Sequence, residues 1–456
     1  MPNVADELRA AGVHAIISPG DAGYADAIAG FDTGTVPAPD VVVDAQTAQD
    51  VASTVAILAE RRETLTILGS GHGRLTGPRG GVAVTLRSLT SVDVDPAART
   101  VRIGAGCTWD PVLAACDAYG LAAPCGSAPG VGVAGYLLGG GLGPIQGSIG
   151  FSSDHVTSIE VVTPADGLIT VSVESHPDLF WAMRGGKGGF GVVVAVTVQV
   201  RPLATLYGGS TYFAAPDVAD VLAAYAQWAP HLPESSTTSI ALIRLPSAPA
   251  LPDAIRGKHV ATVRFASLAA PQTARTLLAA IRAAAPVLLD TIDVLPYSKI
   301  GTIHGDPTHP MPVANGSVPL SALGADAVAS LLAAEDLAGD KPLSSVEIRT
   351  LGPAARRAPT SGDAVGGREA AHLLNVYAAP DPALSDGARL DAVRAVLTAV
   401  DAWRAPGNLV NFVGRANDAE AIVDSWTPDQ NDRLDAIRTA HDPEVMFPFA
   451  RHARLG

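Results

Sequence analysis

The fold is decided by Thr66-Ile67-Leu68-Gly69-Ser70-Gly71-His72-Gly73-Arg74-Leu75-Thr76-Gly77. A short apolar run ends here in a loop of small residues that carries one imidazole. Glycine has no Cβ, so the backbone N–H groups of such a loop can approach an anion closely. The pattern predicts a strand followed by an anion-binding loop, with His72 held beside the ligand.

Two further loops of small residues follow. Residues 130–143 read Gly-Val-Gly-Val-Ala-Gly-Tyr-Leu-Leu-Gly-Gly-Gly-Leu-Gly. Residues 179–193 read Leu-Phe-Trp-Ala-Met-Arg-Gly-Gly-Lys-Gly-Gly-Phe-Gly-Val-Val. One such loop alone is typical of a tight turn. Three in succession favour one large ligand that runs through a single domain.

The three loops resemble those of FAD-linked oxidases of the vanillyl alcohol oxidase and p-cresol methylhydroxylase superfamily. The most similar branch is the berberine-bridge-enzyme-like group. The resemblance covers roughly residues 35–205 and, more weakly, the C-terminal tail. It implies an α+β fold of two domains: a PCMH-type FAD domain, and a substrate domain made of an antiparallel sheet covered by helices.

The resemblance also implies how FAD is held. His72 occupies the position at which the family bonds a histidine ring nitrogen to the flavin 8α-methyl group. Many relatives form a second bond through a cysteine, but that position is Ala128 here, and Cys125 lies three residues early. We therefore expect a single attachment, as in the 6-hydroxy-D-nicotine oxidase type.

The glycine loops and the tail supply the remaining expected FAD contacts. Val131 falls where the family controls the access of oxygen, and a valine there goes with oxidase behaviour. Asn411 belongs to a tail segment that resembles the one lying over the flavin. The expected cofactor-binding residues are Gly69, Ser70, Gly71, His72, Gly73, Val131, Gly132, Val133, Gly135, Gly191, Val193 and Asn411.

The length of 456 residues is too great for one ordinary core, so we expect more than one domain. We assign residues 1–204 to the FAD domain, 205–407 to the substrate domain, and 408–456 to a segment that returns to the FAD domain. Alternating and helical periodicities predict the elements. Expected helices include 48–62, 217–229, 268–284, 324–338, 388–403 and 429–440; expected strands include 41–43, 65–68, 237–245, 258–266, 344–351 and 372–379, with a loop at 300–317.

Two of the expected strands carry the candidate catalytic groups. Residues two apart in a strand share a face, so Asn375 with Tyr377, or Glu347 with Arg349, could point inward together. We predict that Asn375 and Tyr377, with Glu347 or His372 as further candidates, face the flavin. Arg349 is the cation expected to lower the pKa of Tyr377. The alternative for each pair is an outer-face ion pair or a hydrogen-bonded core group.

Composition restricts the partners. The formal net charge of −14 argues against nucleic acid and anionic membrane surfaces. No secretory signal and no bilayer-spanning run is apparent, so we expect a cytoplasmic protein. Three cysteines imply no disulfide framework and fit no metal-ligand spacing, so no metal is expected. The oligomeric state is left open between monomer and homodimer.

The predicted function is an FAD-dependent oxidase that acts on a small alcohol, amine or phenolic substrate with O₂ as acceptor. The alternatives are a flavin-dependent dehydrogenase or a biosynthetic oxygenase on the same scaffold. A more remote alternative is a non-redox binding module with a vestigial flavin fold.

Overall fold

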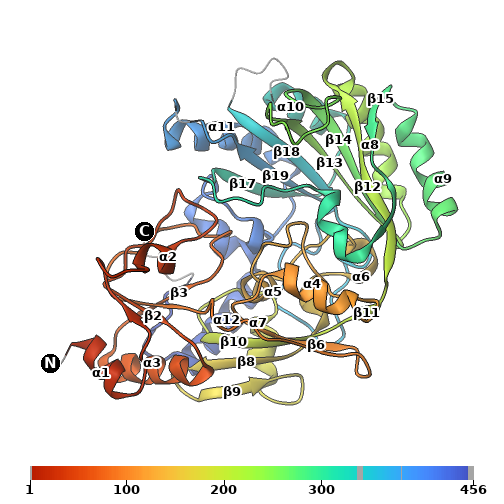
Figure 1. Cartoon of the computed structure of the whole chain (residues 1–456). Coiled ribbons are helices and arrows are strands. Elements are labelled where there is room, and N and C mark those ends of the chain that lie inside the picture. Colours follow the sequence, from red (N-terminus) through yellow and green to blue (C-terminus); the bar gives the residue numbers. More distant parts are fainter. Residues whose placement is uncertain (1–2, 336–341, 382, 450–456) are drawn as a thin grey trace.

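The strands form two small sheets, one large sheet and a two-stranded ribbon, as the computed structural model in Figure 1 shows. The structure describes residues 3–335, 342–381 and 383–449. In Figure 1 the two smaller sheets occupy the lower half, and the large sheet with its helices occupies the upper half. Among the described residues, no helix combines the length and apolar character that crossing a bilayer requires.

The first sheet contains the strand that leads to His72. Its order is β1 (Ile16–Ile17), β2 (Val41–Asp44), β4 (Val82–Thr85) and β3 (Leu65–Leu68), with β2 and β3 parallel to β4. Helix α3 (Ala48–Arg61) connects β2 to β3 and begins at a capping box of Thr47 and Asp50. The predicted strand, helix and strand over 41–68 are therefore confirmed. The short helices α1 (Val4–Ala10) and α2 (Tyr24–Ile28) precede them.

The second sheet is antiparallel. Its order is β5 (Val92–Asp95), β6 (Thr100–Gly104), β10 (Val192–Gln199), β8 (Val156–Thr163) and β9 (Gly167–Val171). Helices α4 (Trp109–Asp117), α5 (Val133–Leu138) and α7 (Pro177–Met183) contribute to the same core, in which Trp109 and Phe180 are almost fully buried. The short strand β11 (Arg201–Pro202), which lies just before the expected domain boundary at residue 204, pairs with β7 (Leu121–Ala122).

The large sheet has eight strands, and every adjacent pair is antiparallel. Its order is β15 (Val287–Asp290), β12 (Thr205–Ala214), β14 (His259–Ser267), β13 (Ser236–Arg244), β18 (Leu343–Thr350), β19 (His372–Ala378) and β17 (Asn315–Leu320), while β16 (Asp293–Pro296) also pairs with β12. Helices α8 (Val218–Trp228), α9 (Pro271–Arg282), α10 (Ala325–Glu335) and α11 (Asp386–Ala399) share an apolar core with one face. The predicted helix-covered antiparallel sheet is confirmed.

Four strands of this sheet were not predicted: β12, β15, β16 and β17. Gly208-Gly209 interrupts the β-forming pattern of β12. Gly209 has a φ of 146°, and a Cβ added there would lie 2.5 Å from the carbonyl oxygen of Thr291, so only glycine fits. β17 overlaps the expected loop at 300–317 and contains Pro319, which an edge strand tolerates. The last residues of the helix expected at 324–338 lie outside the described residues.

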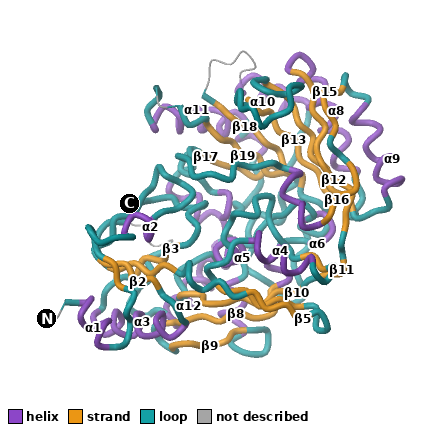
Figure 2. The backbone as a smooth tube through the Cα atoms, in the orientation of Figure 1, coloured by secondary structure: helices purple, strands orange, loops and turns teal. Residues whose placement is uncertain are grey.

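The C-terminal tail lies against the third glycine loop. Helix α12 (Pro428–His441) contacts α7, and its Arg438 donates hydrogen bonds to the carbonyl oxygens of Gly186 (3.0 Å) and Gly188 (3.1 Å). Figures 1 and 2 show α4, α5 and α6 (Gln146–Ile149) between the five-stranded and eight-stranded sheets. The second glycine loop therefore borders the space between the two halves of the molecule.

Candidate cofactor and substrate site

The first and second glycine loops are joined through Ser70. Its Oγ accepts a hydrogen bond from the Gly132 N–H (3.1 Å) and lies 3.1 Å from Nδ1 of His72. A Cβ added at Gly132 would lie only 3.1 Å from this Oγ. Ser70, His72 and Gly132, three residues predicted to bind the cofactor, are therefore brought together.

The second and third loops are joined by backbone and side-chain hydrogen bonds. The N–H groups of Gly185 and Lys187 both donate to the Leu138 carbonyl oxygen, at 3.0 and 2.9 Å. Asn411 donates from Nδ2 to the Tyr136 carbonyl oxygen (2.7 Å). A Cβ added at Gly139 would lie 2.1 Å from Oδ1 of Asn411, so glycine is required there. The tail residue Asn411 is thus part of the same assembly.

His72 is half-buried, and its ring stacks on Phe31 with 4.1 Å between the ring centroids and 15° between the planes. Burial lowers the pKa of His72 to about 4, although the charge of Asp306 acts in the opposite direction. The imidazole is therefore neutral at pH 7, the state in which a ring nitrogen has a free lone pair. Phe31 was not identified from the sequence, because nothing local links it to residue 72.

The other predicted cofactor residues differ in whether they are surrounded by open space or by other protein atoms. Gly69, Gly73 and Gly135 have open space where a Cβ would lie, as a loop that receives a ligand requires. The others are held by packing or hydrogen bonding. Gly71 lies against Gly30 and Gly191 against Val162, and the backbone of Val131 is hydrogen-bonded to Ala128 and Trp109. Val133 is buried, and Val193 is part of β10.

Three of the four predicted catalytic residues share one face of the large sheet. Glu347 in β18 is directly paired with Asn375 in β19, and Tyr377 lies two residues further along. Their neighbours Ile348 and Leu374 belong to the helix-covered core, so the three polar side chains point to the opposite face.

The fourth residue, His372, is not brought together with the others. It alternates with them along β19, which puts it on the helix-covered side of the sheet. There its Nδ1 lies 3.1 Å from Oγ1 of Thr350, and this hydroxyl is also bonded to Tyr225. We therefore do not include His372 in the proposal below.

Glu347 has no carboxylate oxygen free to accept a proton. One oxygen accepts hydrogen bonds from Arg264 (2.6 Å) and Ser239 (2.9 Å), and the other accepts from Arg349 (2.8 Å). Burial alone would raise the pKa of Glu347, but the charges of Arg349 and Arg264 outweigh it and hold the pKa well below its usual range. Glu347 thus acts as the fixed anion between two arginines.

Tyr377 is a protonated phenol at neutral pH. We expected the charge of Arg349 to lower the pKa of Tyr377. Arg349 does act in that direction, but the pKa is raised overall, so the expectation of a lowered pKa was wrong. Burial raises the pKa of Tyr377, and the opposing hydrogen bond from Asn375 and charge of Arg349 are weaker. Nδ2 of Asn375 donates to the Tyr377 hydroxyl (3.1 Å), while Oδ1 of Asn375 is buried without a hydrogen-bond partner in the described part of the chain.

Asp306 was missed from the sequence. Its Oδ2 accepts a hydrogen bond from Ser127 (2.8 Å), and the same Ser127 hydroxyl lies 3.4 Å from Nη2 of Arg349. Its charge acts on His72, Arg349 and Tyr377. Asp306 therefore lies between the first glycine loop and the polar face of the sheet. Asp306 lies in a segment without helical or strand periodicity. The only feature that could have singled it out in the sequence is an acidic residue in a proline-rich loop.

The loop that carries Asp306 is anchored to the N-terminal segment beside His72. The Met311 N–H donates to the Phe31 carbonyl oxygen (2.9 Å), and the Thr33 N–H donates to that of Met311 (3.1 Å). Oδ1 of Asp32 accepts from the Val313 N–H (2.9 Å). Asp306 is thus held in position from the segment beside His72 as well as from the sheet.

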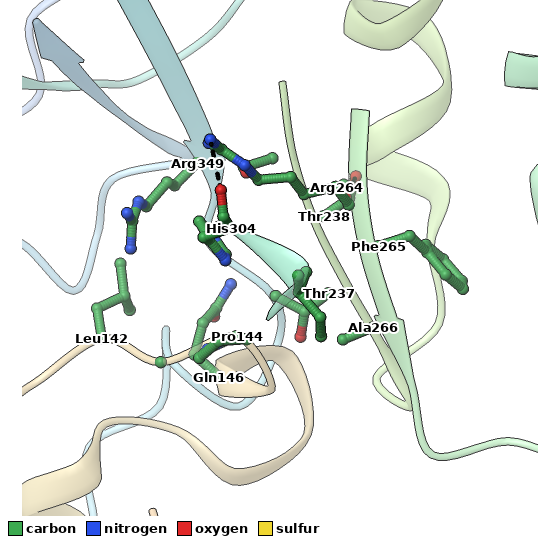
Figure 3. Close-up of a pocket in the computed structure, with 13 residues that line it drawn as sticks. Leu142, Pro144, Gln146, Thr237, Thr238, Arg264, Phe265, Ala266, His304 and Arg349 are labelled. Atoms are coloured by element: carbon green, nitrogen blue, oxygen red, sulfur yellow. Dashed lines mark hydrogen bonds between the residues drawn. The ribbon is translucent and has the colours of Figure 1, made fainter. Parts of the chain in front are cut away.

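A small, partly open pocket adjoins this cluster. Figure 3 shows the loop at Leu142 to Gln146 on one side and the strands β13 and β14 on the other, with His304 between them. Nε2 of His304 lies 3.5 Å from Glu347, and its Nδ1 is buried without a described partner. The lining residues are Leu142, Gly143, Pro144, Gln146, Thr237, Thr238, Ser239, Arg264, Phe265, Ala266, Ile303, His304 and Arg349.

Residues 39–172 match the family of FAD binding domains. They include the first two glycine loops and the attachment candidate His72. The chain is 32% identical to (R)-6-hydroxynicotine oxidase of Paenarthrobacter nicotinovorans over 223 residues, which is 48% of this chain and 45% of that protein. The chain therefore contains an FAD binding domain at residues 39–172 and is similar to FAD-linked oxidoreductases and oxidases. The resemblance seen in the three loops is confirmed.

Other relatives extend the comparison. The FAD-dependent monooxygenase FUP4 of Fusarium proliferatum is 36% identical over 174 residues, 38% of this chain and 34% of that protein. These alignments thus span only about a third to a half of the relatives' lengths. The solved structure of BBE-like 1 from Physcomitrella patens has a TM-score of 0.85 at 17% identity and 98% coverage of both chains. That of 6-hydroxy-D-nicotine oxidase from Arthrobacter nicotinovorans has 0.78 at 23% identity, with 95% and 96% coverage. The predicted α+β fold is confirmed.

The residues present fit FAD as the cofactor. Open space at Gly69, Gly73 and Gly135 lets backbone groups approach a ligand, and the close contact at Gly139 excludes any larger residue. Backbone N–H groups in such loops bind phosphate without needing side-chain charge. FAD is the cofactor that this domain family takes.

Proposed function

We propose that the protein is an FAD-dependent oxidase of small molecules, with the flavin attached covalently to His72 and O₂ as the electron acceptor. The observation that carries this proposal is the position of Asp306, which is bonded to Ser127 beside the second glycine loop and lies close to the polar face of the large sheet. A flavin held beside His72 would face groups able to bind and deprotonate a substrate.

When bound, FAD supplies the hydride acceptor. The chain itself must bind the substrate hydroxyl or amine and remove its proton. Oδ1 of Asn375 is the free acceptor for that group, and the Tyr377 hydroxyl lies beside it. These two residues position the substrate in this proposal.

Elimination favours Asp306 as the proton acceptor. Both oxygens of Glu347 accept hydrogen bonds and its two arginine neighbours hold its pKa well below the usual range, while the phenol of Tyr377 holds its proton at neutral pH. In the described part of the chain Asp306 accepts a side-chain hydrogen bond only through Oδ2, from Ser127, which leaves Oδ1 available to a substrate hydroxyl or amine. The substrate class is therefore an alcohol, phenol or amine whose O–H or N–H proton leaves as its C–H hydride is transferred.

The division of the chain belongs to the same proposal. Residues 1–204 and 408–456 would form the FAD domain, and 205–407 the substrate domain. The hydrogen bonds of Asn411 and Arg438 to the second and third loops support a tail that completes the FAD domain.

A second candidate is a flavin-dependent oxygenase, because the relative from Fusarium proliferatum is named a monooxygenase. Oxidases and oxygenases differ in the fate of O₂. An oxidase releases one peroxide for each O₂ consumed, whereas an oxygenase transfers an oxygen atom from ¹⁸O₂ to its product.

The test is an anaerobic screen of alcohols, phenols and amines for bleaching of the flavin, followed by admission of air. We expect one class to bleach the flavin, and air to restore the colour with stoichiometric peroxide. Asp306→Asn should slow bleaching by roughly two to four orders of magnitude, the usual loss for a general base. The matched control is Asp401→Asn, which makes the same change in an exposed ion pair with Arg404 and should leave the rate of bleaching unchanged. Bleaching by no class, or at equal rates in the Asp306 variant, would count against the proposal.

A further inference from the structure

Lys187 is a side chain placed where the backbone favours glycine. Its φ is 68°, in the left-handed region, and it stands among Gly185, Gly189 and Gly191, whose φ values are also positive. A non-glycine residue there is strained, and such strain persists only when the surrounding structure fixes it. The question is therefore what the lysine side chain does in this loop.

The ammonium group of Lys187 links the third glycine loop to the second loop and to the tail. Nζ donates hydrogen bonds to the carbonyl oxygen of Gly135 (2.9 Å) in the second loop and to Oδ1 of Asn411 in the tail. Both acceptors are neutral. Nζ has three N–H groups, and the described residues provide partners for two of them.

No carboxylate in the described part of the chain forms an ion pair with Lys187, whose pKa burial lowers to about 8 without any opposing charge. A neighbouring cation, Arg438, is different because Asp435 lies 3.0 Å from it. A partly buried cation without a counter-charge is unfavourable, and a bound anion offsets that cost.

We infer that Lys187 supplies the positive charge that faces an anionic part of the bound FAD, either its pyrophosphate or the pyrimidine edge of the reduced flavin. This inference rests on the proposed FAD-dependent function. It makes Lys187 a cofactor-positioning residue. The free N–H of Nζ is the group that contacts the cofactor.

The test compares Lys187→Gly with Lys187→Arg. Glycine removes the charge and suits the left-handed backbone, so it should fold, whereas arginine keeps the charge. Both changes are made in a His72→Ala background, in which FAD is expected to exchange freely. The dissociation constants of FAD and ADP and the midpoint potential of the flavin are then measured. Substrate turnover is not needed for either readout.

Loss of one charge-assisted hydrogen bond should weaken FAD binding about ten- to hundred-fold in Lys187→Gly. If the charge faces the pyrophosphate, ADP binding weakens equally and the potential is unchanged. If the charge faces the flavin ring, ADP binding is unchanged and the potential falls, because reduced FAD loses more affinity than oxidised FAD. Lys187→Arg should restore most of the affinity.

Unchanged FAD affinity, ADP affinity and potential in Lys187→Gly would overturn the inference and leave Lys187 a structural link. Failure of the proposed function has a different signature. In that case the parent protein contains no flavin, or holds a flavin that no substrate reduces.

Discussion

Glu347 provides the sharpest test of how the polar face of the sheet works. We predict that Glu347→Gln destabilises the protein without removing its proton acceptor. The substitution keeps the shape of the side chain but deletes the charge that lies between Arg264 (2.6 Å) and Arg349 (2.8 Å). Removing one partner of a buried ion pair leaves the other charge uncompensated, at a typical cost of about 3–5 kcal/mol. The cost here should lie in that range, because two arginines lose their counter-charge.

The assay is chemical denaturation together with rapid-mixing measurement of flavin reduction. The matched control is Glu234→Gln, which makes the same change in an exposed pair with Arg357 (2.7 and 3.0 Å) and should leave stability nearly unchanged. Flavin reduction in Glu347→Gln should slow as Arg349 shifts, with its pH profile unchanged in shape. Parental stability combined with a loss of two to four orders of magnitude in flavin reduction would refute this reasoning, because Glu347 would then be the base.

Three further outcomes are expected. Tyr377→Phe should slow flavin reduction about ten- to hundred-fold, the loss of one hydrogen bond to the substrate, with FAD content unchanged; parental rates would remove Tyr377 from the site. Val131→Leu should slow the reoxidation of reduced flavin by air and leave substrate reduction nearly unchanged, and equal reoxidation rates would exclude Val131 as the oxygen-access residue. Burial lowers the pKa of His372 from 6.5 to about 4. As the pH falls through this range, the unfolded chain binds a proton at His372 before the folded protein does, so stability is lost between pH 6.5 and 4. Denaturation midpoints of His372→Asn should fall less over that range, and an identical pH slope would contradict this.

Local patterns predicted those parts of the fold that depend on local structure. The β-branched run at 41–43, the apolar run at 65–68 and the helical spacing between them identified β2, α3 and β3. β12 was missed because Gly208-Gly209 opposes strand formation, and only the close backbone approach at Thr291, far along the chain, explains those glycines.

In the candidate site, too, some residues could be predicted from local patterns and others depend on contacts between distant segments. The glycine loops were visible because close approach to a ligand requires particular residue types at adjacent positions. Alternation along β19 was also sufficient to separate His372 from Asn375 and Tyr377, and it should have removed His372 from the candidates. The pairing of Glu347 with Asn375 depends on strand register between segments that are distant in sequence.

Asp306 and the pKa of Tyr377 were beyond local patterns. Asp306 lies in an aperiodic loop, and its role depends on Ser127 and on anchors at Phe31 and Asp32. The direction of the Tyr377 pKa shift depends on the balance between burial and the charge of Arg349, which only the packed structure determines.

The central claim is that this chain carries FAD bonded to His72. The most direct measurement is the visible spectrum of the purified protein before and after acid precipitation, followed by mass analysis of its proteolytic peptides. We predict a yellow precipitate, and a peptide containing residue 72 whose mass is increased by that of the flavin. A colourless protein would contradict the cofactor, and a flavin that remains in the supernatant, or is found on a peptide containing Cys125, would contradict its attachment to His72.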